Sequence, residues 1–189
     1  KINNSLRKKI IIISNFELLQ KQLKILKYPV NLIKIKNIGE NSKPHLLKIL
    51  DVELKFENPF KIKKKNLKDF IINSLTLAHN LSLTNDIIGM INCPINKNVL
   101  DMKNIGVTEY LASKCKIVDN SEAMLIKSDK LTVCPITTHL DIKDISKKLT
   151  GPLIVNKIKT INKWYKKNKK LSPKIGVLGL NPHNAELRK

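Results

Sequence analysis

This 189-residue sequence has few of the residues that several common protein classes require. No unbroken apolar run exceeds four residues, as at 10–13, whereas a membrane-spanning helix needs roughly 20. The three cysteines, Cys93, Cys115 and Cys134, are too far apart for a C-x-x-C metal or redox motif. The short apolar runs lead us to expect no membrane span. The cysteines are typical of small buried residues in a reducing compartment, which favours the cytoplasm.

Acidic residues are also scarce: 15 Asp and Glu stand against 36 Lys and Arg, a formal net charge of +21. Such a charge suggests nucleic acid, because basic surfaces supply most of the affinity for phosphate backbones. Yet only Arg7 and Arg188 are arginine, and specific readers of bases and phosphates rely on the guanidinium fork. Aromatic residues, at 4%, are too few for a base-stacking platform. The composition argues against nucleic acid, but a non-catalytic α/β module whose basic surface binds nucleic acid or another anionic partner stays open as an alternative.

The spacing of the apolar residues predicts alternating strands and helices, and hence an α/β fold. A strand over 9–14, a helix capped by Asn15 and a strand over 30–35 form a unit typical of a parallel sheet with helices on its faces. The other expected helices span 45–50, 67–83, 106–114 and 142–149, with a longer one opened by Pro152, and the other expected strands span 86–92, 123–127, 131–137 and 174–180. Residues 128–130 suit a hairpin, so we expect a mixed sheet.

Histidines follow two of these predicted strands at matching positions. His139 comes after two threonines, and His183 comes after Asn181 and a proline. Ligands of α/β sheets bind beyond the carboxyl ends of strands, so two neutral imidazoles there could converge on one divalent metal. A catalytic metal site needs a third protein ligand, and His45 and His79 fit structural roles better. That third ligand is missing from these residues.

Two further segments carry groups suited to an anionic ligand. Thr108 lies at the start of the expected helix over 106–114, where its hydroxyl and the first amides could hold an anion. The alternative is a simple helix cap, with Glu109 favoured by the positive end of the helix. Lys97 follows another predicted strand and could hold a phosphate as a point charge. The sequence has no G-x-G-x-x-G motif and no P-loop, so a nucleotide would have to be bound in another way.

Two loop segments are long enough to compare with known families. Residues 137–145 read TTHLDIKDI, and residues 179–186 read GLNPHNAE. They resemble the T-T-H-L-x-L-x-D-[VI] and G-L-N-P-H-A-G-E segments of the 4-hydroxythreonine-4-phosphate dehydrogenase family. Their order and spacing agree with that family, as do the Pro-Ile-Asn-Lys stretch at 94–97 and the Thr-Glu pair at 108–109.

The resemblance implies an NAD- and divalent-metal-dependent oxidoreductase of vitamin B6 (pyridoxine) biosynthesis. Such an enzyme oxidises 4-phosphooxy-L-threonine, a phosphorylated hydroxy amino acid, to a keto acid that loses carbon dioxide. Family members are homodimers with an α/β/α layered, two-domain architecture like that of the isocitrate and isopropylmalate dehydrogenases. On this basis residues 1–85 belong to the first α/β domain, and residues 86–189 belong to the second domain with the metal-site loops.

Carried over by position, the resemblance makes His139 and His183 two of three histidine ligands of a Zn, Mg, Mn or Co ion. It makes Thr108 a contact of the substrate phosphate, with Lys97 as a second substrate-binding residue. The family's third histidine, its cofactor-binding portion and its N-terminal segment are not found in this sequence, which we expect to be part of a longer chain. Val107 stands where the family usually has His, which leaves open a paralogue that acts on another phosphorylated hydroxy acid.

Overall fold

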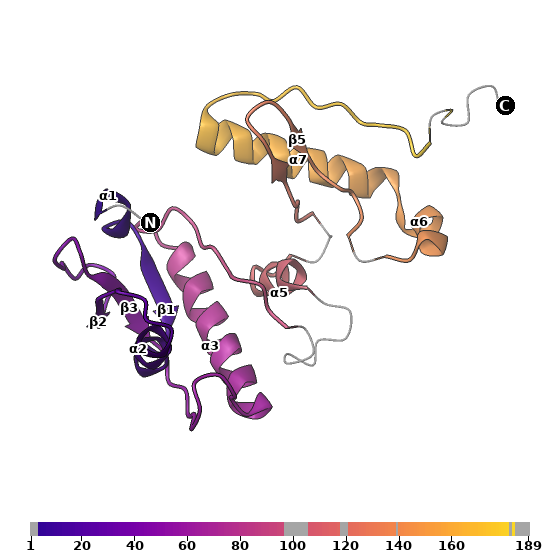
Figure 1. Ribbon diagram of the computed structural model, residues 1–189. Helices are drawn as coiled ribbons and strands as arrows, with labels where there is room; N and C mark the ends of the chain where they lie inside the picture. Colours follow the sequence, from indigo (N-terminus) through magenta and orange to yellow (C-terminus); the bar gives the residue numbers. More distant parts are fainter. Residues whose placement is uncertain (1–3, 97–105, 118–120, 139, 182, 184–189) are drawn as a thin grey trace. The chain divides into compact units, whose positions relative to one another are not determined.

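The computed structural model describes residues 4–96, 106–117, 121–138, 140–181 and 183 (Figure 1). The chain divides into two compact units, Lys1–Lys103 and Asn104–Lys189. No helix within the described ranges is both long and apolar enough to cross a membrane.

The first unit is built on a three-stranded parallel sheet. Its strand order is β1 (Ile11–Ser14), β3 (Leu47–Asp51), β2 (Leu32–Ile35), and both neighbouring pairs run parallel. Helix α1 (Asn4–Arg7) precedes β1, and α2 (Phe16–Ile25) connects β1 to β2. The strand-helix-strand unit predicted from the apolar spacing is therefore confirmed.

The central strand of this sheet is the element that the sequence pattern misassigned. A helix over 45–50 was expected, but Leu47–Asp51 forms β3, and Ile49 is completely buried. Periodicity cannot distinguish a short apolar run in a buried strand from a short buried helix. The strand conformation depends on hydrogen bonds to β1 on one side and β2 on the other, and both partners are distant in sequence.

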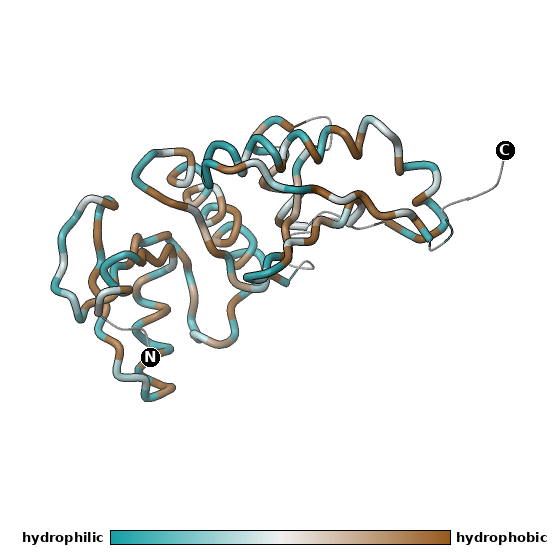
Figure 2. The backbone as a smooth tube through the Cα atoms, turned by 90° about the horizontal axis from the view of Figure 1, so that it is seen from above, coloured by the Kyte–Doolittle hydropathy of each residue, from teal (hydrophilic) through white to brown (hydrophobic). Residues whose placement is uncertain are grey.

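Two helices pack on the sheet and complete the core of the first unit. Helix α2 contacts β2 and β3, and the long helix α3 (Lys64–Ser82), close to its predicted bounds, contacts β1. The helical turns in Figure 2 carry both hydrophobic and hydrophilic segments, as amphipathic helices do. Among the described residues of this unit, the buried apolar side chains are Leu18, Ile35, Ile49, Leu50, Val52, Leu54 and Leu75.

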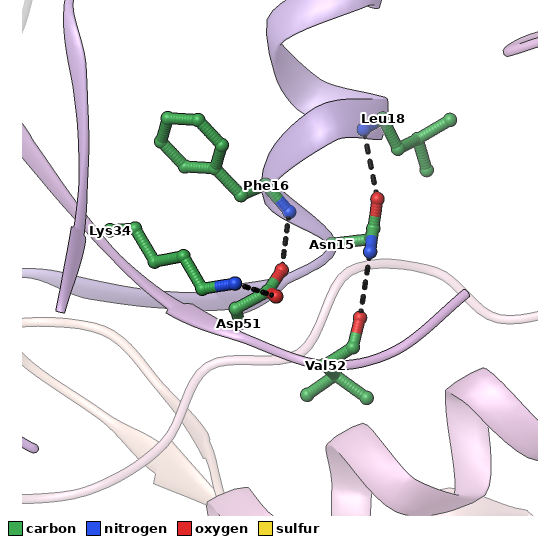
Figure 3. A network of polar contacts seen from close by, with 6 residues as sticks. All are labelled: Asn15, Phe16, Leu18, Lys34, Asp51 and Val52. Carbon is green, nitrogen blue, oxygen red and sulfur yellow. Dashed lines mark hydrogen bonds and ion pairs between the residues drawn. The ribbon is translucent and has the colours of Figure 1, made fainter. Parts of the chain in front are cut away.

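A polar network joins the start of α2 to the ends of the strands (Figure 3). The buried Asn15 caps α2 by accepting a hydrogen bond from the Leu18 amide at 2.9 Å, and it donates one to the Val52 carbonyl at 3.0 Å. Asp51, the last residue of β3, accepts a hydrogen bond from the Phe16 amide at 2.7 Å. The Lys34 ammonium lies 2.6 Å from the other oxygen of the same carboxylate.

The second unit contains three helices and a short hairpin among its described residues. Helices α5 (Val107–Lys114), α6 (Ile142–Lys148) and α7 (Gly151–Lys169) lie close to their predicted positions. Thr150 caps α7, and Pro152 lies in its first turn, where a missing amide proton costs nothing. Strands β4 (Ile126–Lys127) and β5 (Thr132–Val133) pair antiparallel across the predicted hairpin.

The predicted strands of the later sequence are shorter or missing in the structure. The hairpin strands keep two residues each and form a sheet separate from the parallel one, so the expected mixed sheet is not seen within the described residues. Residues 86–92 and 174–180 are irregular, and Ile88, Ile91 and Leu178 lie almost fully exposed. A strand is held by its neighbours, and these segments have no ladder partner within the described residues. The apolar pattern is present in both, but the pairing that would make each a strand is not.

Candidate functional site

The start of α5 holds the first group of predicted site residues. Gly106, not Thr108, is the N-cap of the helix, so the interpretation of Thr108 as a cap is wrong. The Gly106 amide donates a hydrogen bond to Oε2 of Glu109 at 2.9 Å. Thr108 lies in the first helical turn with its side chain exposed. Its hydroxyl is thus open to an anionic group close to the positive end of the helix dipole.

Glu109 also connects this turn to the Thr-Thr segment that follows β5. The Thr138 hydroxyl donates a hydrogen bond to Oε1 of Glu109 at 3.0 Å, across 29 positions of sequence. Thr138 directly precedes the predicted ligand His139, which lies outside the described residues, as does Lys97. The structure therefore brings the neighbours of two predicted site residues together, and one carboxylate forms the contact.

His183, the other predicted metal ligand, is exposed. Its backbone amide donates a hydrogen bond to the Asn181 side-chain oxygen at 3.1 Å, which forms a local turn. The preceding residues 174–180 are not a strand, so the argument from matching strand ends does not hold for this histidine. No group of three His, Cys, Asp or Glu side chains suited to a metal ion occurs among the residues with described positions.

The remaining histidines have structural surroundings. His79 is buried in the last turn of α3, with Nδ1 3.4 Å from the Asn80 side-chain oxygen. His45 is exposed, and its backbone carbonyl accepts a hydrogen bond from Arg7 at 3.0 Å. A cavity of about 330 Å³ at the end of α2 and the start of β2 is lined by Leu23, Tyr28 and their neighbours and contains none of the predicted site residues.

Sequence reasoning missed the buried Lys157 of α7, which is only 5% exposed. Its ammonium donates a hydrogen bond to the Glu122 carbonyl oxygen. The signal was present, because Lys157 lies three residues after Ile154 and four before Ile161 on the apolar stripe of the helix. Burial raises the pKa of the Cys134 thiol above its ordinary value, and Lys157 partly opposes that shift.

Two of the three cysteines differ from the expectation of burial. Cys93 and Cys115 are exposed, and Cys134 is half-buried. Cys93 lies in the irregular stretch over 87–96, and Cys115 is the residue at which α5 ends. Segment ends face solvent more often than the middle of a helix or strand, whatever the residue type.

Comparison with known proteins gives a consistent result. The family model described as pyridoxal phosphate biosynthetic protein PdxA matches residues 6–188. A curated 4-hydroxythreonine-4-phosphate dehydrogenase from Sulfurihydrogenibium sp. is 29% identical over 182 residues, which are 93% of this chain and 55% of that protein. One from Hydrogenobaculum sp. is 39% identical over 103 residues, 52% of this chain and 32% of that protein. The chain thus spans about half the length, or less, of these curated relatives.

Solved structures show the same fold. The crystal structure of 4-hydroxythreonine-4-phosphate dehydrogenase from Klebsiella pneumoniae matches with a TM-score of 0.81 and 24% identity, over 93% of this chain and 56% of that one. The enzyme of the same name from Burkholderia phymatum matches with a TM-score of 0.78 and 23% identity, over 97% of this chain and 56% of that one.

Proposed function

Because the chain belongs to the pyridoxal phosphate biosynthetic protein PdxA family, we propose that the full-length protein is an NAD-dependent 4-hydroxythreonine-4-phosphate dehydrogenase. It oxidises the hydroxyl of 4-phosphooxy-L-threonine, and the resulting keto acid loses carbon dioxide. One observation in the structure supports a site of this kind most directly: the hydrogen bond between Glu109 and Thr138 joins two motifs that lie 29 residues apart.

Thr108 is the proposed contact of the substrate phosphate. Its exposed hydroxyl in the first turn of α5 can donate to a phosphate oxygen, and the aligned peptide dipoles favour an anion there. Lys97 is the proposed second contact, because an ammonium binds phosphate as a point charge. Together these residues would hold the anionic end of the substrate and leave its hydroxyl free to react.

His139 and His183 are the proposed ligands of a divalent metal. The exposed imidazole of His183 suits such a role, since a neutral ring nitrogen is a common ligand of Zn²⁺ and related ions. The described residues do not make a complete site, so at least one further ligand must come from elsewhere. A metal bound there would polarise the substrate oxygen and so favour hydride departure to the nicotinamide of NAD.

The oligomeric state, the domain arrangement and the location are proposed from the family as well. We infer a homodimer with two α/β domains arranged as in the isocitrate dehydrogenases, and a cytoplasmic location. The division into residues 1–85 and 86–189 stays a prediction. The compact units described above divide near residue 103, in a stretch outside the described residues.

A paralogous activity is the second candidate, and Val107 is the observation that favours it. Val107 is the first residue of α5, directly before Thr108, where the family usually has a histidine. An isopropyl group cannot donate a hydrogen bond to phosphate. The change therefore favours a different phosphorylated hydroxy acid as substrate, or weaker binding of the same one.

The test is NADH formation by the full-length protein with 4-phosphooxy-L-threonine and Mn²⁺. We expect His183→Ala to lower the rate of NADH formation at least about 100-fold. Removing a metal ligand costs more activity than removing a residue that only orients a ligand. His45→Ala, which removes an exposed histidine from the first unit, should leave the rate unchanged.

Three outcomes would change these assignments. Full activity of His183→Ala would contradict the metal role of His183. Turnover of a related acid without turnover of the threonine phosphate would establish the paralogue. Tight, strongly salt-dependent DNA binding without metal uptake would favour the non-catalytic basic module.

A further inference from the structure

Both carboxylate oxygens of Glu109 are used, and they have different partners. Oε2 accepts the hydrogen bond from the Gly106 amide at 2.9 Å, and this bond fixes the first turn of α5. Oε1 accepts the hydrogen bond from the Thr138 hydroxyl at 3.0 Å. The first bond is local and the second joins distant parts of the sequence. The bond to the Gly106 amide is half-buried, whereas the Glu109–Thr138 bond lies at the exposed surface, where water and salt screen it more.

Glu109 and Thr138 each lie next to a proposed site residue. Thr108, the proposed phosphate contact, directly precedes Glu109, and His139, a proposed metal ligand, directly follows Thr138. A carboxylate beside an anion site would repel the ligand if it were free to turn toward it. With each oxygen accepting a hydrogen bond from the protein, Glu109 is suited to orient its neighbours and not to bind the substrate.

We propose that Glu109 is a positioning residue that couples the phosphate-binding turn at Thr108 to the metal-binding segment at Thr138. This inference rests on the proposed function. In this proposal the Glu109 carboxylate sets the distance between the phosphate-binding turn and the metal-binding segment. Breaking the Glu109–Thr138 bond then weakens phosphate binding and metal binding together, because this bond joins the two segments.

Variants at the two ends of the bond separate this role from a general loss of stability. Thr138→Val keeps the branched shape and removes the hydroxyl, whereas Thr138→Ser keeps the hydroxyl and removes a methyl group. Glu109→Ala removes the long-range bond and the Gly106 bond together. Because Glu109→Ala and Thr138→Val delete the same contact, their combined effect should be smaller than the sum of the two.

Thr132→Val is the matched control in the same unit. The Thr132 hydroxyl lies 3.3 Å from the Tyr165 hydroxyl, across 33 positions of sequence, so this variant also loses a long-range hydroxyl contact. It does not connect the two predicted motifs. A difference between Thr138→Val and Thr132→Val therefore reports on the site itself.

The experiment uses the full-length protein and two measurements. Titration calorimetry gives the Mn²⁺ dissociation constant, and steady-state kinetics gives KM and kcat for 4-phosphooxy-L-threonine. We expect Thr138→Val to raise both KM and the Mn²⁺ dissociation constant about 10-fold, as loss of a residue that orients a ligand does. Thr138→Ser and Thr132→Val should stay within about twofold of the parent protein, and Glu109→Ala with Thr138→Val should be no worse than Glu109→Ala alone.

The outcomes distinguish this proposal from the proposed function. Unchanged KM and Mn²⁺ affinity in Thr138→Val would overturn the positioning role, and so would equal losses in Thr138→Val and Thr132→Val. If the parent protein binds Mn²⁺ but does not oxidise the substrate, the proposed function fails while the Mn²⁺ constants still test the coupling. If it neither binds Mn²⁺ nor oxidises the substrate, both proposals fall.

Discussion

Asn15 illustrates how much of the first unit depends on a single side chain. Its oxygen caps α2, and its amide nitrogen satisfies the Val52 carbonyl just after β3. An aspartate could provide the cap but not the second bond, because a carboxylate has no proton to donate. The asparagine is thus specified by two requirements at once, and only the first of them is visible in the sequence.

We expect Asn15→Ala to lower the free energy of unfolding by about 2–4 kcal/mol. The lost cap costs about 1 kcal/mol, and the unsatisfied Val52 carbonyl costs about 1–3 kcal/mol. Urea denaturation followed by circular dichroism measures the change, with Asn31→Ala, at an exposed position, as the control. A loss below about 0.5 kcal/mol would mean that water or another donor reaches the Val52 carbonyl.

At the scale of elements, the scarcity of glycine changes how helices end. Among the residues that the structure describes, three non-glycine residues have positive φ, and all are lysines at the ends of α2, α5 and α7: Lys27, Lys116 and Lys170. After α2, the Lys27 amide donates to the Lys24 carbonyl at 3.2 Å, and the Tyr28 amide donates to the Leu23 carbonyl at 2.9 Å. This pair of bonds is a Schellman motif, in which glycine normally takes the left-handed position.

We therefore expect Lys27→Gly to stabilise the first unit by about 0.5–1 kcal/mol. Glycine removes the steric cost of a left-handed side-chain residue, and that gain exceeds its entropy cost in the unfolded chain. The matched control is Lys24→Gly, inside the same helix, which should destabilise by about 1 kcal/mol. Thermal unfolding of both variants gives the comparison, and destabilisation by Lys27→Gly would show that the Lys27 side chain has a packing role.

At the scale of the whole molecule, the net charge of +21 results from 34 lysines and only two arginines against 15 Asp and Glu. Lysines lie in each of the longer helices α2, α3 and α7, and among the residues with described burial only Lys157 is a buried lysine. Such a distribution attracts polyanions without forming a patch that reads bases.

We expect the protein to bind random-sequence duplex DNA weakly in 50 mM salt and to release it in 200 mM salt, with no sequence preference. Binding that depends on counterion release falls by about 10³-fold or more over that range when several phosphates are contacted. Fluorescence anisotropy at the two salt concentrations measures it. Retained tight binding in 200 mM salt would favour the basic binding module over the dehydrogenase.

The sequence by itself determined the longer helices, the cap at Asn15 and the family. The cap at Asn15 and the bounds of α3, α5 and α6 depend on side chains within a few residues, so local spacing predicts them. The two loop motifs and the match over residues 6–188 are likewise properties of the chain alone.

Only the tertiary structure decided which apolar segments are strands and which motif residues meet. Leu47–Asp51 is the central strand because two distant strands pair with it, whereas 86–92 and 174–180, with the same kind of pattern, pair with no segment in the described part of the chain. In the same way, nothing in the spacing of Glu109 and Thr138 predicts their hydrogen bond. Contacts between segments far apart in sequence depend on how the chain closes on itself, and local periodicity carries no information about that.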